Sequence, residues 1–397
     1  MSLGEGLAEL EAIGVRSDGV HRFAWSEEDR ATREWFREQA VRAGLSYARD
    51  AAGNLWAHPG DPAPWWGVGS HLDSVRGGGR FDGPLGVAAG FAVAARKATG
   101  VAVLSLADEE GARFNTPTFG SKALTGALDV PAVLTRADER GITLADAMRA
   151  DGVDPDGLVG APAWLDLLCG FVELHIDQST DVAEAGQPIG IVSALAGRMR
   201  LEVTLTGQAD HAGTTPPAQR RDALGTAARL IVSAEELGAD RPGMRVTSSR
   251  ILVEPNATTT IAAHVRLWID ARAPAAALVD DWLAAVRARS AELAERSHVQ
   301  IAVTVASRSE SRAFSEQMRE ALHHASVETL GHDVPEVICF AGHDAGVLAA
   351  KIPAAMVLVR NPTGVSHALQ ESVAVEDADV GVAVIERAIA LLSKGAQ

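Results

Sequence analysis

The chain has few cysteines, and it lacks an excess of basic residues. Only Cys169 and Cys339 occur among 397 residues. Both lie in apolar segments, so we expect two buried free thiols and a reducing compartment. The 36 lysines and arginines are outnumbered by 52 aspartates and glutamates, which gives a formal net charge of −16. This balance argues against nucleic acid or an anionic membrane as a partner.

Long hydrophobic runs are also missing. No apolar stretch reaches the roughly 20 residues that span a bilayer. The first dozen residues carry acidic side chains and no signal-peptide hydrophobic region, so we expect a cytoplasmic protein. The overall composition, with 47% hydrophobic and 22% charged residues, is typical of a globular protein. At roughly 150 residues per domain, the length leaves room for two domains.

Buried strands alternate with helices in the first half of the chain and again near its C-terminus. The apolar runs that we interpret as strands cover residues 67–71, 101–107, 171–175 and 354–359. Amphipathic patterns predict helices over 26–44 and 376–393. The alternation predicts an α/β fold, in which a mostly parallel central sheet carries helices on both faces.

The middle of the chain has a different pattern. Hydrophobic and polar residues alternate at 199–206, 260–270 and 299–305, which is typical of an antiparallel sheet with one exposed face. Helical patterns over 217–237 and 275–296 lie between these segments. We therefore expect an inserted α+β sandwich at 194–309, within a larger domain built from 1–193 and 310–397.

The segment GVGSHLDSVRGGGRFDGPLGV (67–87) ends a predicted strand at His71 and places Asp82 before a helix. Ligand sites of open α/β sheets lie at the carboxyl ends of strands. An imidazole and a carboxylate suit zinc or a similar first-row metal. We expect the Asp73 carboxylate to accept the second ring N–H of His71 and fix its tautomer. Taken alone, however, such a segment is more often a strand that simply ends in polar residues.

Three further predicted strand ends carry residues of the same types, namely Glu109-Glu110, His175 and His367. Successive side chains of a strand alternate, so one glutamate of the pair can bind metal while the other acts as a general base toward water. Two metals about 3.5–4 Å apart can activate water and stabilise a tetrahedral transition state. A solvated loop is the alternative for Glu109-Glu110 taken alone.

These segments together resemble the hydantoinase/carbamoylase branch of the di-zinc aminoacylase and carboxypeptidase-like metallohydrolases. The motifs that carry the resemblance follow one another in the family's order along nearly the whole chain. They are GSHLDSV (69–75), GGRFDGPLGV (78–87), DEEGARF (108–114), ELHIDQ (173–178), ADHAGTTP (209–216), the stretch from Pro255-Asn256 to Asp270-Ala271-Arg272, AGHDA (341–345) and GVSHALQE (364–371). Each motif alone is weak evidence, but eight in order are specific.

The resemblance implies a zinc-exopeptidase-like fold and a centre with two divalent metal ions. The cofactor would be zinc, with manganese, cobalt or nickel as alternatives. The implied ligands are His71, Asp82 and His175 for the first ion and Asp82, Glu110 and His367 for the second. Glu109 would be the general base. A histidine at 175, where related peptidases usually have a carboxylate, favours the amidohydrolase branch over the peptidases.

The inserted domain of this family dimerises and closes as a lid, which implies roles for its residues. His211 would polarise the scissile carbonyl or stabilise the oxyanion, and Arg272 would bind a substrate carboxylate in bidentate fashion. A turn-stabilising hydrogen bond is the alternative for His211, and a surface salt bridge is the alternative for Arg272. The remaining residues expected to bind substrate are Gln178, Thr259 and Gly364.

Three positions depart from the family pattern. Thr259 stands where the family has a substrate-binding asparagine, and Ala262 replaces a usual proline. The usual His-Ile-Glu-Gln-Gly reads His175-Ile176-Asp177-Gln178-Ser179. None is an implied metal ligand, so the departures concern the substrate, because threonine offers a shorter hydroxyl in place of an amide. His343-Asp344 could support the centre or be merely structural.

The implied reaction is hydrolysis of the carbamoyl C–N bond of an N-carbamoyl-L-amino acid, with a homodimer as the assembly. Allantoate, another ureido acid, is the nearest alternative substrate. An aminoacylase or dipeptidase is a further alternative, and so is a non-catalytic binding protein of the same fold. The complete set of implied ligands and base argues against the last, because a binding protein has no need to retain it.

Overall fold

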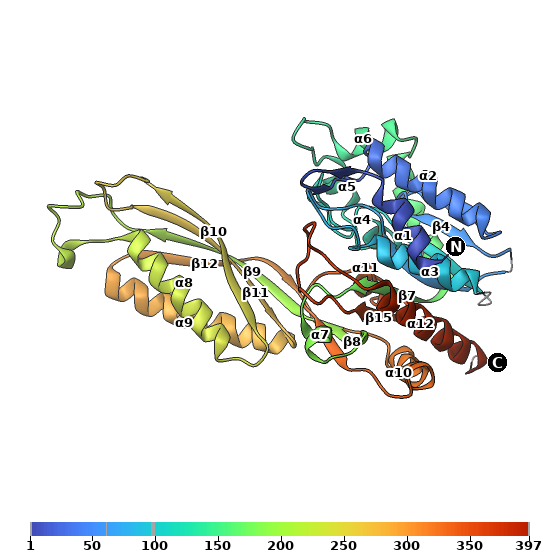
Figure 1. Ribbon diagram of the computed structural model, residues 1–397. Helices are drawn as coiled ribbons and strands as arrows, with labels where there is room; N and C mark the ends of the chain where they lie inside the picture. Colours follow the sequence, from blue (N-terminus) through green and yellow to red (C-terminus); the bar gives the residue numbers. More distant parts are fainter. Residues whose placement is uncertain (1, 61, 97–99, 396–397) are drawn as a thin grey trace. The chain divides into compact units, whose positions relative to one another are not determined.

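The computed structural model describes residues 2–60, 62–96 and 100–395 (Figure 1). By its internal contacts the chain divides into two compact units. The first unit comprises Met1–Ser193 and Ala313–Gln397, and the second comprises Ala194–Arg312. The insertion predicted from the sequence spans 194–309, and the second unit ends at Arg312.

A mixed sheet forms the centre of the first unit, in the order β13-β8-β15-β7-β5-β6-β4-β3, with β14 paired to β8. Strands β15, β7, β5 and β6 are parallel to one another, whereas β3, β4 and β8 pair antiparallel. The strands are β3 (Ser46–Arg49), β4 (Leu55–His58), β5 (Trp65–His71), β6 (Val101–Leu106), β7 (Leu168–Ile176), β8 (Ile189–Leu195), β13 (Arg312–Ala313), β14 (Glu336–Cys339) and β15 (Ala354–Val359). This sheet confirms the predicted α/β class, and its parallel strands end on one edge.

Helices cover both faces of this sheet (Figure 1). On one face α3 packs against β5 and β6, and α1, α2, α10 and α12 complete the layer; on the other, α4, α11 and η1 contact the sheet. Every residue of α3 from Pro84 to Val93 is buried, which explains its uniformly small and apolar sequence. The helices are α1 (Leu3–Glu11), α2 (Glu27–Arg42), α3 (Pro84–Ala95), α4 (Phe119–Thr125), α5 (Val130–Leu134), α6 (Leu144–Ala150), η1 (Pro155–Leu167), α7 (Asp181–Glu184), α10 (Glu316–Leu330), α11 (Asp344–Leu348) and α12 (Val375–Gly395). A short hairpin, β1 (Val15–Arg16) and β2 (Gly19–Val20), follows α1.

The second unit is an antiparallel sheet in the order β10-β11-β9-β12, with α8 and α9 packed on one face. Its elements are β9 (Gly197–Thr206), η2 (Pro217–Gln219), α8 (Ala223–Ala239), β10 (Arg245–Glu254), β11 (His264–Ala273), α9 (Ala276–Ser297) and β12 (Gln300–Ser309). Along β9, buried residues alternate with more exposed ones, as the sequence predicts. The α+β sandwich therefore has a core of its own.

Several details differ from the sequence predictions. The strand expected over 260–270 begins at His264, because the preceding residues bond to a neighbouring loop; Ile261 N–H donates to Asp210 O at 2.8 Å. Strand β10 was not predicted, since a bulge between Ser248 and Arg250 interrupts its alternation. Cys339 is buried as expected, but Cys169 is only half-buried. Within the described ranges, no helix combines the length and apolar character that a membrane crossing requires.

Candidate metal centre

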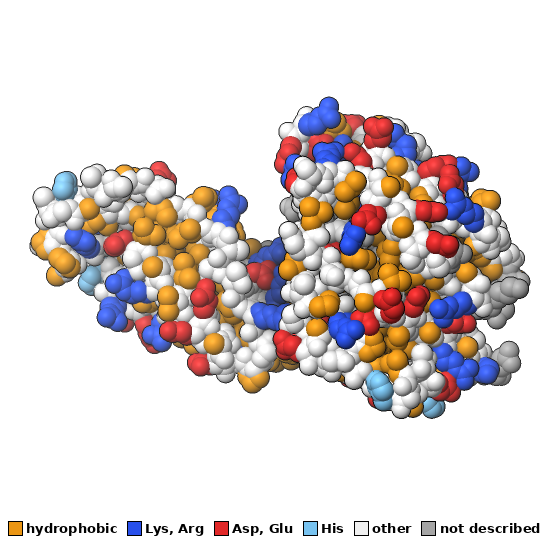
Figure 2. All heavy atoms as spheres, in the orientation of Figure 1, with side chains coloured by type: hydrophobic (Ala, Val, Ile, Leu, Met, Phe, Trp, Pro, Cys, Tyr) orange, Lys and Arg blue, Asp and Glu red, His pale blue; other side chains and the backbone are white. Residues whose placement is uncertain are grey.

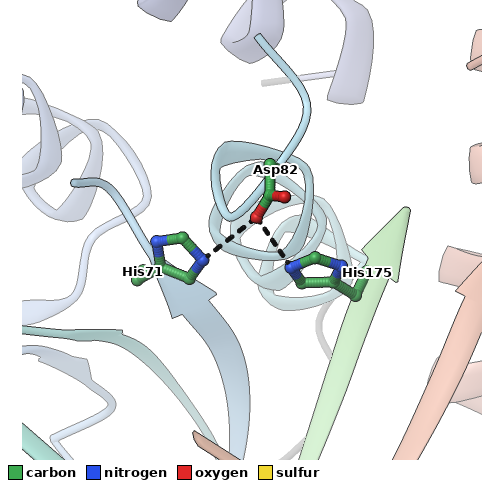
Figure 3. A group of neighbouring side chains, drawn as sticks. All are labelled: His71, Asp82 and His175. Carbon is green, nitrogen blue, oxygen red and sulfur yellow. Dashed lines mark ion pairs between the residues drawn. The ribbon is translucent and has the colours of Figure 1, made fainter. Parts of the chain in front are cut away.

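Three residues of the metal-ligand type meet at the carboxyl edge of the central sheet. His71 ends β5 and His175 lies near the end of β7; neither is exposed to solvent. Asp82 lies in the loop between β5 and α3, and its Oδ1 is 3.4 Å from His71 Nε2 and 3.2 Å from His175 Nε2 (Figure 3). Ligand atoms of all three residues lie within 4.8 Å of one another. The structure thus brings together the three residues expected around the first ion.

Gly83 allows the Asp82 loop to approach His71 this closely. Its φ is +85°, a region that residues with a side chain rarely adopt. A Cβ at this position would lie 2.5 Å from His71 Cε1 and 2.7 Å from the His71 carbonyl oxygen. Only glycine therefore fits between Asp82 and the N-terminus of α3.

Both imidazoles are held in one tautomer. His71 Nδ1 lies 3.1 Å from Asp73 O, and His175 Nδ1 lies 2.9 Å from Ile176 O. Because a carbonyl oxygen can only accept, each Nδ1 must carry the ring proton. The two Nε2 atoms are buried and make no hydrogen bond within the described part of the chain. In the neutral rings their lone pairs therefore face Asp82, as in histidines that bind metal.

Asp73 occupies the place behind His71, but its carboxylate has other partners. Asp73 Oδ1 is 3.6 Å from His71 Nδ1, farther than the backbone oxygen of the same residue. The carboxylate instead accepts the backbone N–H groups of Glu109 and Glu110, each at 3.1 Å. Asp73 thus ties the end of β5 to the segment that follows β6.

A second group of possible ligands shares Asp82 with the first. Asp82 Oδ2 and Glu110 Oε1 each lie 3.5 Å from His367 Nε2. Ligand atoms of these three residues also lie within 4.8 Å of one another. His367 is in the loop after β15, its side chain is 46% exposed, and its φ is +57°. The second group is therefore built on loops, whereas the histidines of the first lie on strands.

Glu109 belongs to neither group. Its Oε2 is 4.0 Å from His71 Nε2, and the side chain is buried. Burial raises the pKa of Glu109 well above its ordinary range; the charge of His71 opposes this, and Asp344 and Glu110 reinforce it. A buried carboxylate with a raised pKa is suited to accept a proton. Burial and the neighbouring Asp82 also raise the pKa of Glu110, to about 8.

Asp82 and its two histidines stabilise one another's charged forms. Burial acts to raise the pKa of Asp82, but His175 and His71 outweigh it and hold that pKa well below its usual range. Burial acts to lower the pKa of His175, but Asp82 raises it to about 9. A metal ion binds the neutral form of imidazole, so a cation held here would compete with protonation of the two rings.

Two residues expected to bind substrate lie in the same unit. Gln178 Nε2 donates to Asp82 Oδ2 at 2.7 Å, so this amide contacts the carboxylate shared by both groups. Gly364 lies in the loop that carries His367. A Cβ at this position would lie 2.8 Å from Thr180 Cγ2, in the segment that follows Gln178.

The other expected residues lie in the second unit, at two ends of its sheet. His211 pairs with Thr260, and Ala212 N–H donates to Thr259 O at 2.9 Å, so the His211 and Thr259 segments lie side by side. Arg272 lies near the far end of β11, where its Nε donates to Asp270 Oδ1 at 2.8 Å.

Two residues near the centre were not assigned a role from the sequence. His343 is buried against His175, with ring centroids 4.3 Å apart, and forms a third possible ligand group with Glu173 and His175. Burial and the charge of His175 lower the pKa of His343 well below its ordinary value, which keeps its ring neutral. Glu371 is the other residue. His343 lies in the motif AGHDA and Glu371 in the motif GVSHALQE, both of which carry the family resemblance. Their place in these motifs is the sequence signal that could have identified them.

The chain is similar to known proteins in both sequence and structure. The model of peptidase family M20/M25/M40 matches residues 67–391. An N-carbamoyl-L-amino acid amidohydrolase of Geobacillus stearothermophilus is 36% identical, over 98% of this chain and 97% of the relative. An allantoate amidohydrolase of Bacillus subtilis is 31% identical, over 94% and 93%. A crystal structure of a hydantoinase/carbamoylase family amidase from Burkholderia multivorans superposes with a TM-score of 0.87 at 31% identity, covering 98% of this chain and 96% of that one.

Proposed function

The chain belongs to peptidase family M20/M25/M40, and from this premise we propose that it cleaves the carbamoyl C–N bond of an N-carbamoyl-L-amino acid. It is an amidohydrolase of the group whose named members include carbamoyl-amino acid and allantoate amidohydrolases. In the proposed reaction water adds its oxygen to the ureido carbon, and the products are the amino acid, carbon dioxide and ammonia.

The observation that carries the proposal is the sharing of Asp82. One of its oxygens faces His71 and His175, and the other faces His367, which also faces Glu110. A carboxylate shared by two ligand groups would let one residue hold two ions, and paired ions are a known means of hydrolysis. A centre with one ion, held by the first group alone, would not use Glu110 and His367, although both lie at this edge of the sheet.

The donor atoms fit two divalent cations, zinc first, with manganese, cobalt or nickel as alternatives. The buried Nε2 atoms of His71 and His175 make no hydrogen bond among the described residues, although buried polar atoms normally have a partner. We assign His71, Asp82 and His175 to one ion and Asp82, Glu110 and His367 to the other. When bound, such ions polarise a carbonyl oxygen and lower the pKa of water.

Glu109 and His211 supply the proton chemistry in this proposal. Glu109 takes a proton from the attacking water and delivers it to the leaving nitrogen. His211 Nδ1 accepts the backbone N–H groups of Gly213 at 3.0 Å and Thr214 at 3.2 Å. The neutral ring therefore carries its proton on Nε2, which can donate to the oxygen that becomes negative in the transition state.

Arg272 binds the substrate carboxylate in this proposal, and its position favours a homodimer. His211 lies beside Thr260, before the start of β11, whereas Arg272 lies near the end of that strand. At about 3.3 Å per residue, His264 and Arg272 are roughly 26 Å apart, far more than the length of a ureido acid. His211 and Arg272 of one chain therefore cannot contact the same substrate molecule, and a second copy would supply one of them.

Exposed hydrophobic residues on the second unit also favour association. Of the ten large hydrophobic residues that are exposed in the described part of the chain, five lie in this unit. They are Leu224, Val232, Ile251, Leu252 and Val305. Figure 2 shows hydrophobic side chains on the surface of this unit. Ile251 and Leu252 lie on β10, one of the two edge strands of this sheet, and edge strands are common sites of pairing with a second chain.

The experiment that tests the proposal is ammonia release by the zinc- or manganese-reconstituted protein. N-carbamoyl-L-methionine and allantoate are assayed side by side, each with and without a chelator. We expect release from the carbamoyl amino acid that is lost on chelation. Release from allantoate alone would replace the proposed substrate with the alternative that the Bacillus subtilis relative favours. Release from neither substrate by protein with bound metal would contradict both.

A further inference from the structure

Glu371 is a buried carboxylate that has no ion-pair partner among the described residues. It is 2% exposed. Its oxygens instead accept three backbone N–H groups: Oε2 accepts those of Phe81 at 3.1 Å and Asp82 at 3.2 Å, and Oε1 accepts that of His367 at 3.3 Å. Such bonds from amides to a charged oxygen are among the stronger hydrogen bonds in proteins. The side chain thus fixes backbone rather than another side chain.

The two backbone segments that Glu371 joins carry residues of the second ligand group. Asp82 N is 289 residues away in the sequence, whereas His367 N is four residues away. One carboxylate therefore fixes the backbone of the bridging aspartate relative to that of the loop histidine. His367 also has a left-handed backbone, which costs energy and persists only where the surroundings hold it.

Gly79 packs against the Glu371 carboxylate and leaves no room for a side chain between them. A Cβ at Gly79 would lie 2.0 Å from Glu371 Oε2 and 2.2 Å from its carboxyl carbon. The glycine-rich turn before Asp82 therefore packs directly against this carboxylate. Any shift of the carboxylate would be transmitted to the turn and to the Asp82 backbone.

We propose that Glu371 is a positioning residue for the second metal ion, because it fixes the backbone of Asp82 relative to that of His367, and both residues would hold this ion. The inference rests on the two-ion centre of the proposed function. The first ion depends on it less, since His71 and His175 lie within strands β5 and β7. Loss of Glu371 should therefore weaken the second ion selectively.

The test is the zinc content of Glu371→Gln at controlled free zinc. The substitution keeps one acceptor oxygen, which can serve Phe81 and Asp82, and turns an amide donor toward His367 N–H. Losses of about 10- to 100-fold in metal affinity are typical when such supporting groups are removed. We expect two ions per wild-type chain and one per variant chain at the same free zinc, with the second ion and turnover recovered in excess zinc.

Two further variants separate positioning from charge and from folding. Glu376→Gln makes the same chemical change at an exposed position of α12 and should bind two ions like the wild type. Gly79→Ala keeps the Glu371 charge but forces the carboxylate to move, so it should also lose the second ion selectively. If Glu371→Gln does not fold, Gly79→Ala decides the question, and unfolding in chelator shows whether each variant is intact.

Three results would overturn the inference. Two ions bound with unchanged affinity in both Glu371→Gln and Gly79→Ala, or a parallel loss of both ions, would show that Glu371 does not act on the second ion. Fewer than two ions in the wild type would instead overturn the two-ion centre, and this inference with it. The wild-type stoichiometry therefore distinguishes the two failures.

Discussion

Asp82 is the side chain around which the other residues of the centre are grouped. Three histidines and Gln178 lie around its two oxygens, within 3.5 Å. A buried carboxylate is costly unless positive charge or hydrogen bonds offset its desolvation. Here His175 and His71 do so, and hold its pKa well below the usual range. At the scale of single residues, the site is therefore a cluster of coupled charges in which each residue depends on its neighbours.

Glu109→Gln tests the division of labour between the adjacent glutamates. Glutamine keeps the shape of the side chain but cannot take up a proton from water. We expect ammonia release to fall about 100- to 10,000-fold, the usual contribution of a general base. Zinc content should stay near that of the wild type, because Glu109 belongs to neither ligand group.

Glu110→Gln is the matched comparison, since it makes the same change one residue along the chain. It removes a charged ligand atom 3.5 Å from His367 Nε2, so zinc content should fall. Unchanged turnover in Glu109→Gln would contradict the assignment of the base. So would a loss of zinc in Glu109→Gln as large as that in Glu110→Gln.

The identity of the clustered residues could be predicted from the sequence more readily than their supporting contacts. His71, Glu110 and His175 follow or end predicted parallel strands, and such strand ends converge on one edge of a sheet. Glu371 lies in the GVSHALQE motif, but its role could not be predicted, because it depends on the backbone of residues 289 and 290 positions away. The same holds for the Asp73 carboxylate, which bonds to Glu109 and Glu110 rather than closely to His71.

At the scale of elements, the turn between β3 and β4 supports the end of β6. Asn54 is fully buried in this turn, and its Oδ1 accepts Ala107 N–H at 2.8 Å. Its Nδ2 donates to Asp50 Oδ2 at 2.8 Å and to Gly120 O at 3.3 Å. One amide thus joins the hairpin, the residue that follows β6 and the start of α4. The segment that leads to Glu109 begins at this junction.

Asn54→Ala should therefore destabilise the first unit. The substitution leaves the Ala107 N–H group without its acceptor and removes a donor from Asp50. A buried polar group left without its partner costs about 1–3 kcal/mol, so we expect a loss of about 2–3 kcal/mol. Urea unfolding in the presence of a chelator measures this. Asn256→Ala, at an exposed position, should change stability by less than about 0.5 kcal/mol. Equal effects of the two substitutions would contradict the role of Asn54.

Element boundaries were predictable where the alternation of buried and exposed residues was regular. The strand at Ala354–Val359 agrees with the prediction, because all six residues are buried between covered faces. Strand β10 was missed, because four consecutive residues, Ser249–Leu252, are exposed beside its bulge and the two-residue period is lost. The two-residue alternation thus predicts a strand only where one face of that strand packs on the core.

At the scale of the whole molecule, the chain has separate hydrophobic cores. One surrounds the central sheet and includes Leu85, Leu174 and Val357. Another lies between the antiparallel sheet and its helices and includes Leu201 and Trp282. The residues that we assign to metal binding belong to the first unit alone. Metal binding should therefore stabilise one unit and leave the intrinsic stability of the other unchanged.

Scanning calorimetry with zinc or with a chelator tests this separation. An ion at 100 times its dissociation constant stabilises the folded state by about 2.7 kcal/mol per independent site. We expect two transitions, of which chelation lowers the one that belongs to the first unit. The transition of the second unit serves as the internal control, because its core contains none of the assigned ligands. Equal shifts of both transitions, or no shift of either, would contradict a metal centre confined to the first unit. A shift that persists in Glu110→Gln at half its size would indicate that one of the two ions still binds, as expected if His71, Asp82 and His175 hold the first ion independently.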